Sequence, residues 1–185
     1  MNPPGGTDPR RAARACVDNH DKEALTLNSS SARYHLAQVN IAKARAPLDH
    51  PLMKGFVDQL DHINALAERS PGFVWRLQTE EGDATSIRVF EDPLIIVNLS
   101  VWESVEALKE YVYAGEHLQV LRSKRDWMER LPAPSLALWW LPVDELPDVA
   151  MALDRLQRLR LQGPSADVFT FARPFPRPER LGEPA

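Results

Sequence analysis

The sequence is poor in cysteine and glycine, and it has no long apolar run. Cys16 is the only cysteine among 185 residues, which excludes a disulfide framework and a cysteine-rich zinc site. The longest purely aliphatic run, Leu94 to Val97, is far too short to span a bilayer, so no membrane partner is expected. The net charge is −4, without the basic patch typical of nucleic-acid binders. These absences leave a soluble globular protein, expected in the cytoplasm.

Three parts of the chain differ in composition. Residues 1–33 mix Pro-Gly turns, an arginine cluster and a serine run without sustained apolar periodicity, which is typical of a disordered tail. Residues 34–172 carry regular apolar patterns and are predicted to form the folded domain. Residues 173–185 are proline-rich and are predicted to be a mobile tail.

The apolar patterns of the domain alternate between strand and helix. A period of two predicts strands over residues 34–42, 73–80, 94–102 and 135–143. Spacings of three and four predict helices over residues 52–67, 105–121 and 149–159. Ser104 is a suitable N-cap for the second helix, and Gly163-Pro164 is expected to end the third. Shorter strands are expected over residues 86–90 and, at a sheet edge, 167–172.

This order of elements predicts an α+β fold of the ferredoxin-like, split βαβ type, with an antiparallel sheet. The third helix and the edge strand are additions at the C-terminal end. In the third strand, residues 95, 97, 99 and 101 are all aliphatic, so this face is predicted to lie under the first two helices. The opposite face carries Asn98, Ser100 and Trp102 and is predicted to be open. Pairing two such faces would close a dimeric α/β barrel, so a homodimer is expected.

One stretch resembles a known superfamily. Residues 98–121, NLSVWESVEALKEYVYAGEHLQVL, place a tryptophan (Trp102) at a strand end, an acidic-serine helix start after it, a Glu-Ala-Leu turn and then His117. This resembles the dimeric α/β-barrel superfamily, which includes antibiotic-biosynthesis monooxygenases, haem-degrading monooxygenases and muconolactone isomerases. With YHLAQVNIA, PGFVWRLQ and the Trp139-Trp140 pair, the chain from Tyr34 to Phe171 resembles one uncharacterised bacterial family of that superfamily.

The resemblance implies roles for a few residues. Asn98 and Trp102 resemble the pair that lines the cavity of cofactor-free, quinone-forming monooxygenases. His117 resembles the haem ligand of the haem-degrading branch, and Asn40 resembles an asparagine of the same branch. The extra helix after the fourth strand departs from the minimal superfamily unit.

The chemistry of these side chains indicates what they can do. Asn98, Trp102 and Arg76 are donors suited to an oxyanion, and His117 is suited to act as a base. These are the candidate catalytic residues. Each also has a structural interpretation: Trp102 as core, Asn98 as a cross-strand partner, Arg76 as one half of an ion pair and His117 as a surface histidine. The candidate substrate-binding residues are Gln38, Asn40, Ser100 and Trp140.

The leading hypothesis is a small oxygenase of secondary metabolism, of the antibiotic-biosynthesis monooxygenase type. It would act on an aromatic or polyketide-like molecule without a cofactor. The alternatives are an acid–base isomerase, cyclase or lyase, a non-catalytic dimeric ligand-binding protein, and a haem-binding protein using His117. The sequence has no nucleophile elbow, P-loop or dinucleotide-binding motif, and no metal site is expected. The basic run Arg122–Arg130 is interpreted as a solvated helix end.

Overall fold

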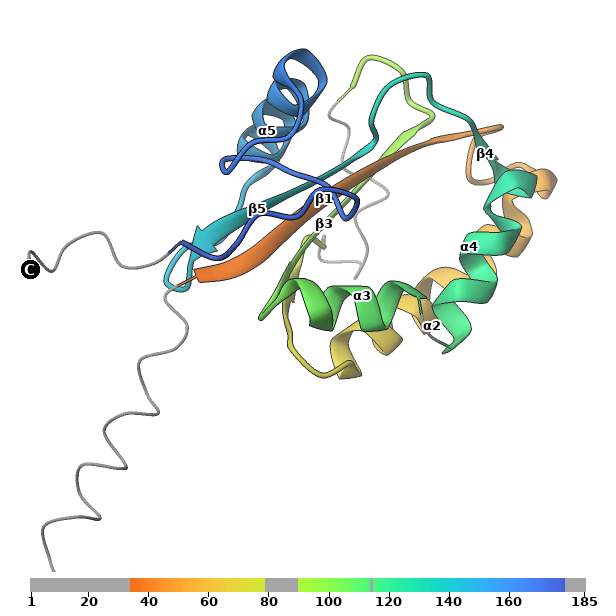
Figure 1. Cartoon of the computed structure of the whole chain (residues 1–185). Coiled ribbons are helices and arrows are strands. Elements are labelled where there is room, and N and C mark those ends of the chain that lie inside the picture. Colours follow the sequence, from red (N-terminus) through yellow and green to blue (C-terminus); the bar gives the residue numbers. More distant parts are fainter. Residues whose placement is uncertain (1–33, 79–89, 114, 179–185) are drawn as a thin grey trace, which may run out of the picture. The chain divides into compact units, whose positions relative to one another are not determined.

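The computed structural model describes residues 34–78, 90–113 and 115–178 (Figure 1). The predictions for residues 1–33, for most of the strand at 86–90 and for residues 179–185 lie outside these residues. The helices and strands, in chain order, are β1 (Tyr34–Ala44), η1 (Pro51–Met53), α2 (Lys54–Arg69), β2 (Phe73–Arg76), β3 (Ile95–Trp102), α3 (Val105–Tyr113), α4 (Gly115–Trp127), β4 (Met128–Glu129), β5 (Leu136–Pro142) and α5 (Val149–Gln162).

The sheet has the strand order of a ferredoxin-like fold. β1 is central, with β3 on one side and β5 on the other, and β2 pairs with the outer edge of β3. These pairings are antiparallel, and the short strand β4 adds two residues beside the end of β1. The predicted α+β, split βαβ fold is therefore confirmed.

Several helix boundaries follow the predicted signals. The Ser104 hydroxyl accepts a hydrogen bond from the Ala107 N–H at 3.0 Å, as expected of an N-cap. α5 ends at Gly163, which has a φ of +78° that favours glycine. The single helix predicted over 105–121 is instead two helices, and Gly115, with a φ of +56°, opens the second of them.

The layers on the two sides of the sheet differ from the prediction. The aliphatic face of β3 packs against α5, not against the first two helices, through a buried core that includes Leu99, Trp139 and Leu156. The polar face is covered by α2, α3 and α4 of the same chain (Figure 1). The prediction of an open polar face was wrong because periodicity shows which side chains share a face but not which element covers it.

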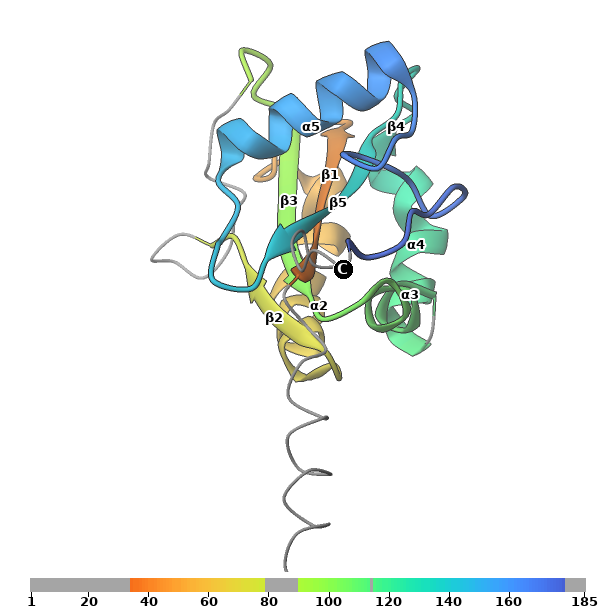
Figure 2. The ribbon, with the colours of Figure 1, turned by 60° about the vertical axis from the view of Figure 1, so that its left-hand side comes forward.

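The end of the described chain packs on β5. Leu138 and Phe169 exchange backbone hydrogen bonds of 2.9 and 2.8 Å. The predicted edge strand over 167–172 is therefore reduced to a single bridge to β5, and Thr170 forms a second bridge with Arg173. Beyond it, the Phe175 carbonyl accepts a hydrogen bond from the Trp140 indole at 3.0 Å. Figure 2, a view turned by 60° from Figure 1, shows that α5 lies across the sheet.

Among the glycines that the structure describes, Gly72 should be the least replaceable. Its φ is +77°, and a Cβ added there would lie 2.6 Å from the Cβ of Ala107. Because backbone strain and overlap add, Gly72→Ala is expected to lower the free energy of unfolding by about 2–4 kcal/mol. Gly115→Ala is the matched control, since Gly115 also has a positive φ but has no atom within 4 Å of an added Cβ. Urea unfolding measures both variants. Equal losses in the free energy of unfolding would contradict the steric overlap between an added Cβ at Gly72 and Ala107.

Candidate functional site

Two asparagines from the central strands face the helices. Asn40 on β1 and Asn98 on β3 are direct partners in the antiparallel register. The Gln38 side-chain amide donates a hydrogen bond to Asn98 Oδ1 at 2.9 Å. Because this bond occupies the oxygen of Asn98, the amide NH₂ of Asn98 is left to face a ligand.

Arg76, on β2, lies at one end of this polar face. Its Nε and Nη2 both donate to Oε1 of Glu68 on α2, at 2.8 Å, and the Arg76 side chain is only 14% exposed. The structure therefore pairs Arg76 within its own chain. A guanidinium held in this way has a fixed direction and can still offer its remaining N–H groups to a ligand.

An aromatic stack connects the sheet to α4. Trp102 stacks on Tyr111 with ring centroids 5.0 Å apart, and Tyr111 contacts the His117 ring at 4.5 Å. Trp102 itself is buried, and its indole N–H donates to the Ser100 hydroxyl at 2.9 Å. The Trp102 indole N–H, which was predicted to stabilise an oxyanion, is therefore already hydrogen-bonded within the protein.

His117 has a defined tautomer. Its Nδ1 lies 3.1 Å from the Val112 carbonyl oxygen, which can only accept a hydrogen bond, so Nδ1 carries the proton. Burial lowers the pKa of the His117 imidazole, although the hydrogen bond to Val112 opposes this shift. The neutral ring therefore keeps an unprotonated Nε2, which is the form needed in a base.

The end of α4 and the first residue of β4 contribute to the site in a way that the sequence did not predict. Lys124, Trp127 and Met128 line the same cavity, although the run that contains them was interpreted as a solvated helix end. Trp127 packs against Phe56 of α2 with ring centroids 6.1 Å apart. The available signal was the spacing of Lys124 and Trp127, which places both on one face of α4 within a charged run, while Met128 begins β4.

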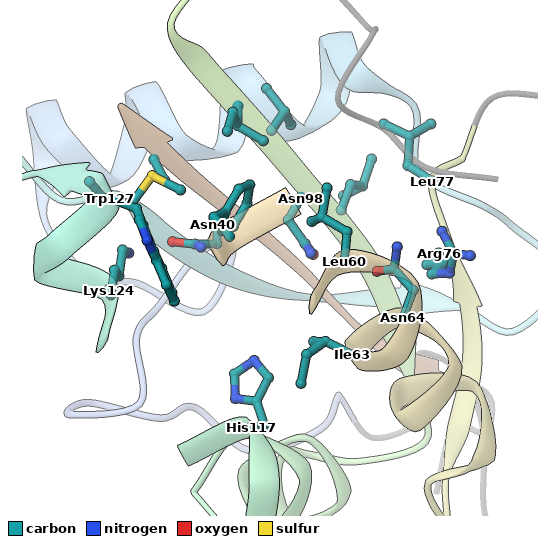
Figure 3. A pocket seen from close by; sticks show the side chains of 16 residues that line it. Asn40, Leu60, Ile63, Asn64, Arg76, Leu77, Asn98, His117, Lys124 and Trp127 are labelled. Carbon is teal, nitrogen blue, oxygen red and sulfur yellow. The ribbon is translucent and has the colours of Figure 1, made fainter. Parts of the chain in front are cut away.

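These groups surround a cavity between the sheet and the helices (Figure 3). It measures about 170 Å³, close to the volume of a protein cavity that binds benzene (about 150 Å³). An adjoining hollow of about 250 Å³ shares Asn40, Asn98 and His117. The residues lining the first cavity are Asn40, Ala42, Phe56, Leu60, Ile63, Asn64, Arg76, Leu77, Ile96, Val97, Asn98, Leu99, His117, Lys124, Trp127 and Met128.

The structure brings only some of the predicted site residues together. Asn40, Arg76, Asn98 and His117 line both hollows, whereas Gln38, Ser100 and Trp102 line only the adjoining one. Trp140 lines neither of them, because its indole is bonded to Phe175 and its ring lies 5.2 Å under the Arg177 guanidinium. The hollow lies within one chain and is not shared between two sheets.

The described residues offer no cluster of metal ligands, and the cavity is small for haem. Within the described ranges, no group of three or more histidine, cysteine or acidic side chains is placed to hold a metal ion. For haem, the bonded Nδ1 of His117 suits an axial ligand, but a cavity of about 170 Å³ is small for a macrocycle of four pyrrole rings. The cavity therefore does not fit haem as it stands. In the part of the chain that the structure describes, no helix has the length and apolar character of a membrane span.

The fold and the site define a class: a ferredoxin-like α+β protein with a cavity between its sheet and its helices. Residues 35–183 match the family described as "Domain of unknown function (DUF3291)", and the chain belongs to that family. A comparison with curated proteins found no match.

The structural neighbours are proteins of the antibiotic-biosynthesis monooxygenase type. SnoaB, a cofactor-independent oxygenase from Streptomyces nogalater, is 18% identical, with a TM-score of 0.43 over 62% of this chain and 98% of SnoaB. A protein from Chloroflexus aurantiacus with the provisional name antibiotic biosynthesis monooxygenase is 14% identical, with a TM-score of 0.39 over 62% of this chain and 98% of that one.

Proposed function

We propose that this protein is a small enzyme in which His117 removes a proton from an aromatic substrate. The observation that carries the proposal is the setting of His117: its ring is fixed through Nδ1 to the Val112 carbonyl and lines a largely apolar cavity. Burial in this setting lowers the pKa of the imidazole and so favours the neutral ring. A general base needs this combination of correct protonation and fixed direction. The Tyr111 ring, held between Trp102 and His117, supports the orientation of the imidazole.

The leading reaction is oxygenation without an organic cofactor. Proton removal by His117 Nε2 leaves an electron-rich substrate anion, which the Asn98 amide NH₂ and Arg76 stabilise. The anion then reduces dioxygen directly. Overall, a CH₂ carbon becomes a carbonyl: it loses two hydrogens, gains one oxygen atom and gives up four electrons, while the second oxygen atom leaves as water. The substrate ring, packed on the apolar side chains that line the cavity, displaces water from around this anion.

The cavity also limits the substrate. A volume of about 170 Å³ holds one aromatic ring, and a fused system extends into the adjoining hollow past Asn98 and His117. We therefore expect that one ring of the substrate lies in the first cavity. A whole polyketide would not fit into that cavity.

Oxygen uptake tests the proposal. The protein is mixed with hydroxylated aromatic compounds in the presence of a metal chelator, and oxygen consumption is recorded with an electrode. Asn98→Ala is expected to lower the rate by about 10²–10³-fold, the typical loss of one oxyanion donor. Gln119→Ala is the control, because Gln119 is an exposed amide on α4. Uptake that the chelator abolishes, or that Asn98→Ala leaves unchanged, would overturn the cofactor-free mechanism.

Two other functions use the same site. An isomerase, cyclase or lyase would need His117 as a base but would turn over without consuming oxygen. A non-catalytic binding protein would take an aromatic ligand into the cavity and leave it unchanged. Product analysis under nitrogen and under air separates these cases from an oxygenase.

The homodimer, a role in secondary metabolism and a cytoplasmic location remain expectations. α5 covers the aliphatic sheet face, and the other face lines the cavity, so the reason first given for a dimer is not present. A dimer of this chain would use a different surface. Sedimentation equilibrium measures its state directly.

A further inference from the structure

The cavity carries an unbalanced positive charge at one end. Among the described residues, no Asp or Glu lines it, and its two permanently basic side chains are Arg76 and Lys124. Arg76 is paired with Glu68, and His117 is neutral near pH 7. Lys124 is different, because its ammonium has no hydrogen bond or ion pair within the part of the chain that is described.

Lys124 lies where a ligand can reach it. It lines the first cavity, the adjoining hollow and a surface hollow beside β4. Figure 3 shows Lys124 and Trp127 together at one end of the cavity, with Arg76 at the other end and His117 between them. Trp127 offers an apolar ring surface beside the ammonium, and Asn40 lies on the strand facing them.

An unpaired ammonium in this position is costly for the free protein. Burial lowers the pKa of Lys124, since nothing nearby compensates for the lost hydration. Among the described residues, the other titratable or charged groups that line the first two hollows are Arg76, His117 and Tyr111, and none of them is an anion near pH 7. The surface hollow has one carboxylate, Glu129, which is paired with Lys43 at 3.8 Å. A ligand anion would supply the missing charge.

We propose that Lys124 forms an anion subsite and that the ligand of this cavity is an aromatic carboxylate. The carboxylate pairs with the Lys124 ammonium, the ring lies against Trp127 and Phe56, and the substituents on the far side of the ring face His117. This proposal rests on the proposed function in one respect only: which end of the ligand reacts at His117. The binding of the anion is independent of catalysis.

The surface next to the subsite suits the approach of an anion. The hollow beside β4 is lined by Arg45, Arg125 and Arg130, with Glu129 as its one acidic residue among those described. Lys124 lies between this basic surface and the interior. A basic entrance raises the local concentration of anionic ligands and their rate of association.

Calorimetric titration with benzoate and with benzamide tests the subsite, since the two have the same shape and differ in charge. At pH 7.5 the full-length protein is expected to bind benzoate at least about tenfold more tightly than benzamide, because a charged partner strengthens the hydrogen bond. Lys124→Met should abolish this preference. The variant should also fold at least as stably as the parent, because it replaces a partly buried charge by an apolar side chain of similar length.

Two control variants separate the explanations. Lys54→Met removes the same charge from α2, where the Lys54 side chain is 74% exposed and lines neither hollow, and should keep the preference for benzoate. His117→Gln should keep it as well while losing turnover, so failure of the proposed reaction and failure of the subsite are distinguishable. Equal binding of the two probes, loss of the preference in Lys54→Met, or no binding of either probe would overturn the proposal.

Discussion

Replacing His117 with glutamine is expected to lower kcat/KM by about 10²–10⁴-fold, the usual contribution of a general base. Glutamine keeps a donor for the Val112 carbonyl, but its side chain cannot take up a proton near neutral pH. The ring contact with Tyr111 is lost as well, yet the sheet and its aliphatic core do not depend on it. Turnover should therefore fall much more than stability.

The pH profile of the parent protein should report the same residue. Because burial lowers the pKa of His117 below 6.5, the neutral, active form is already present at pH 6.5, and activity should rise with pH through an apparent pKa below that value. The phenol of Tyr111, which contacts the imidazole, does not titrate in that range, because burial raises its pKa. His117→Gln should remove this acidic limb from the residual activity.

His62→Gln is the matched control, since His62 is an exposed histidine on α2. It should leave both the rate and the acidic limb unchanged. A His117→Gln variant with undiminished kcat/KM would exclude the base, and a parent profile whose acidic limb lies above pH 6.5 would contradict the neutral imidazole.

Leu156→Ala should lower the free energy of unfolding by about 2–5 kcal/mol, the usual result of removing a buried leucine side chain. Leu156 is 1% exposed and lies in the cluster that joins α5 to the aliphatic face of the sheet. Its loss leaves a cavity against side chains that are themselves fixed by sheet pairing, so the gap cannot close by a shift of α5 alone. The stability of the domain thus depends on a helix outside the minimal βαββαβ unit.

Leu161→Ala on the same helix provides the comparison, because Leu161 is 75% exposed. Its effect should stay within about 0.5 kcal/mol, as for surface positions generally. Denaturant unfolding followed by circular dichroism measures both variants. Similar small losses in the two would mean that α5 is only loosely attached to the sheet in solution.

The sequence predicted much of the fold from local signals. The alternation in residues 34–42 and 94–102, the capping hydroxyl of Ser104 and the glycine at 163 correspond to β1, β3 and the ends of α3 and α5. These signals depend on backbone geometry and near neighbours in the chain, so they can be recognised without knowledge of the tertiary structure.

The candidate site was predicted less completely. Asn40, Arg76, Asn98 and His117 were expected to share a cavity, and they do line one. The indole of Trp102 was expected to face a ligand, but it is bonded to Ser100. Lys124 was missed because a lysine among other charges in a helix is usually solvated, and only the approach of α4 to the sheet buries it.

By itself, the sequence determined the order and type of the elements and which side chains share each face of the sheet. The tertiary structure decided what covers those faces: α5 on the aliphatic side, and α2, α3 and α4 over the polar side that becomes the cavity. The physical reason is that strand periodicity is a property of the backbone, whereas the covering layer is chosen by packing between segments far apart in the chain. An apolar face gains the same burial from either layer, so its composition alone does not select between them.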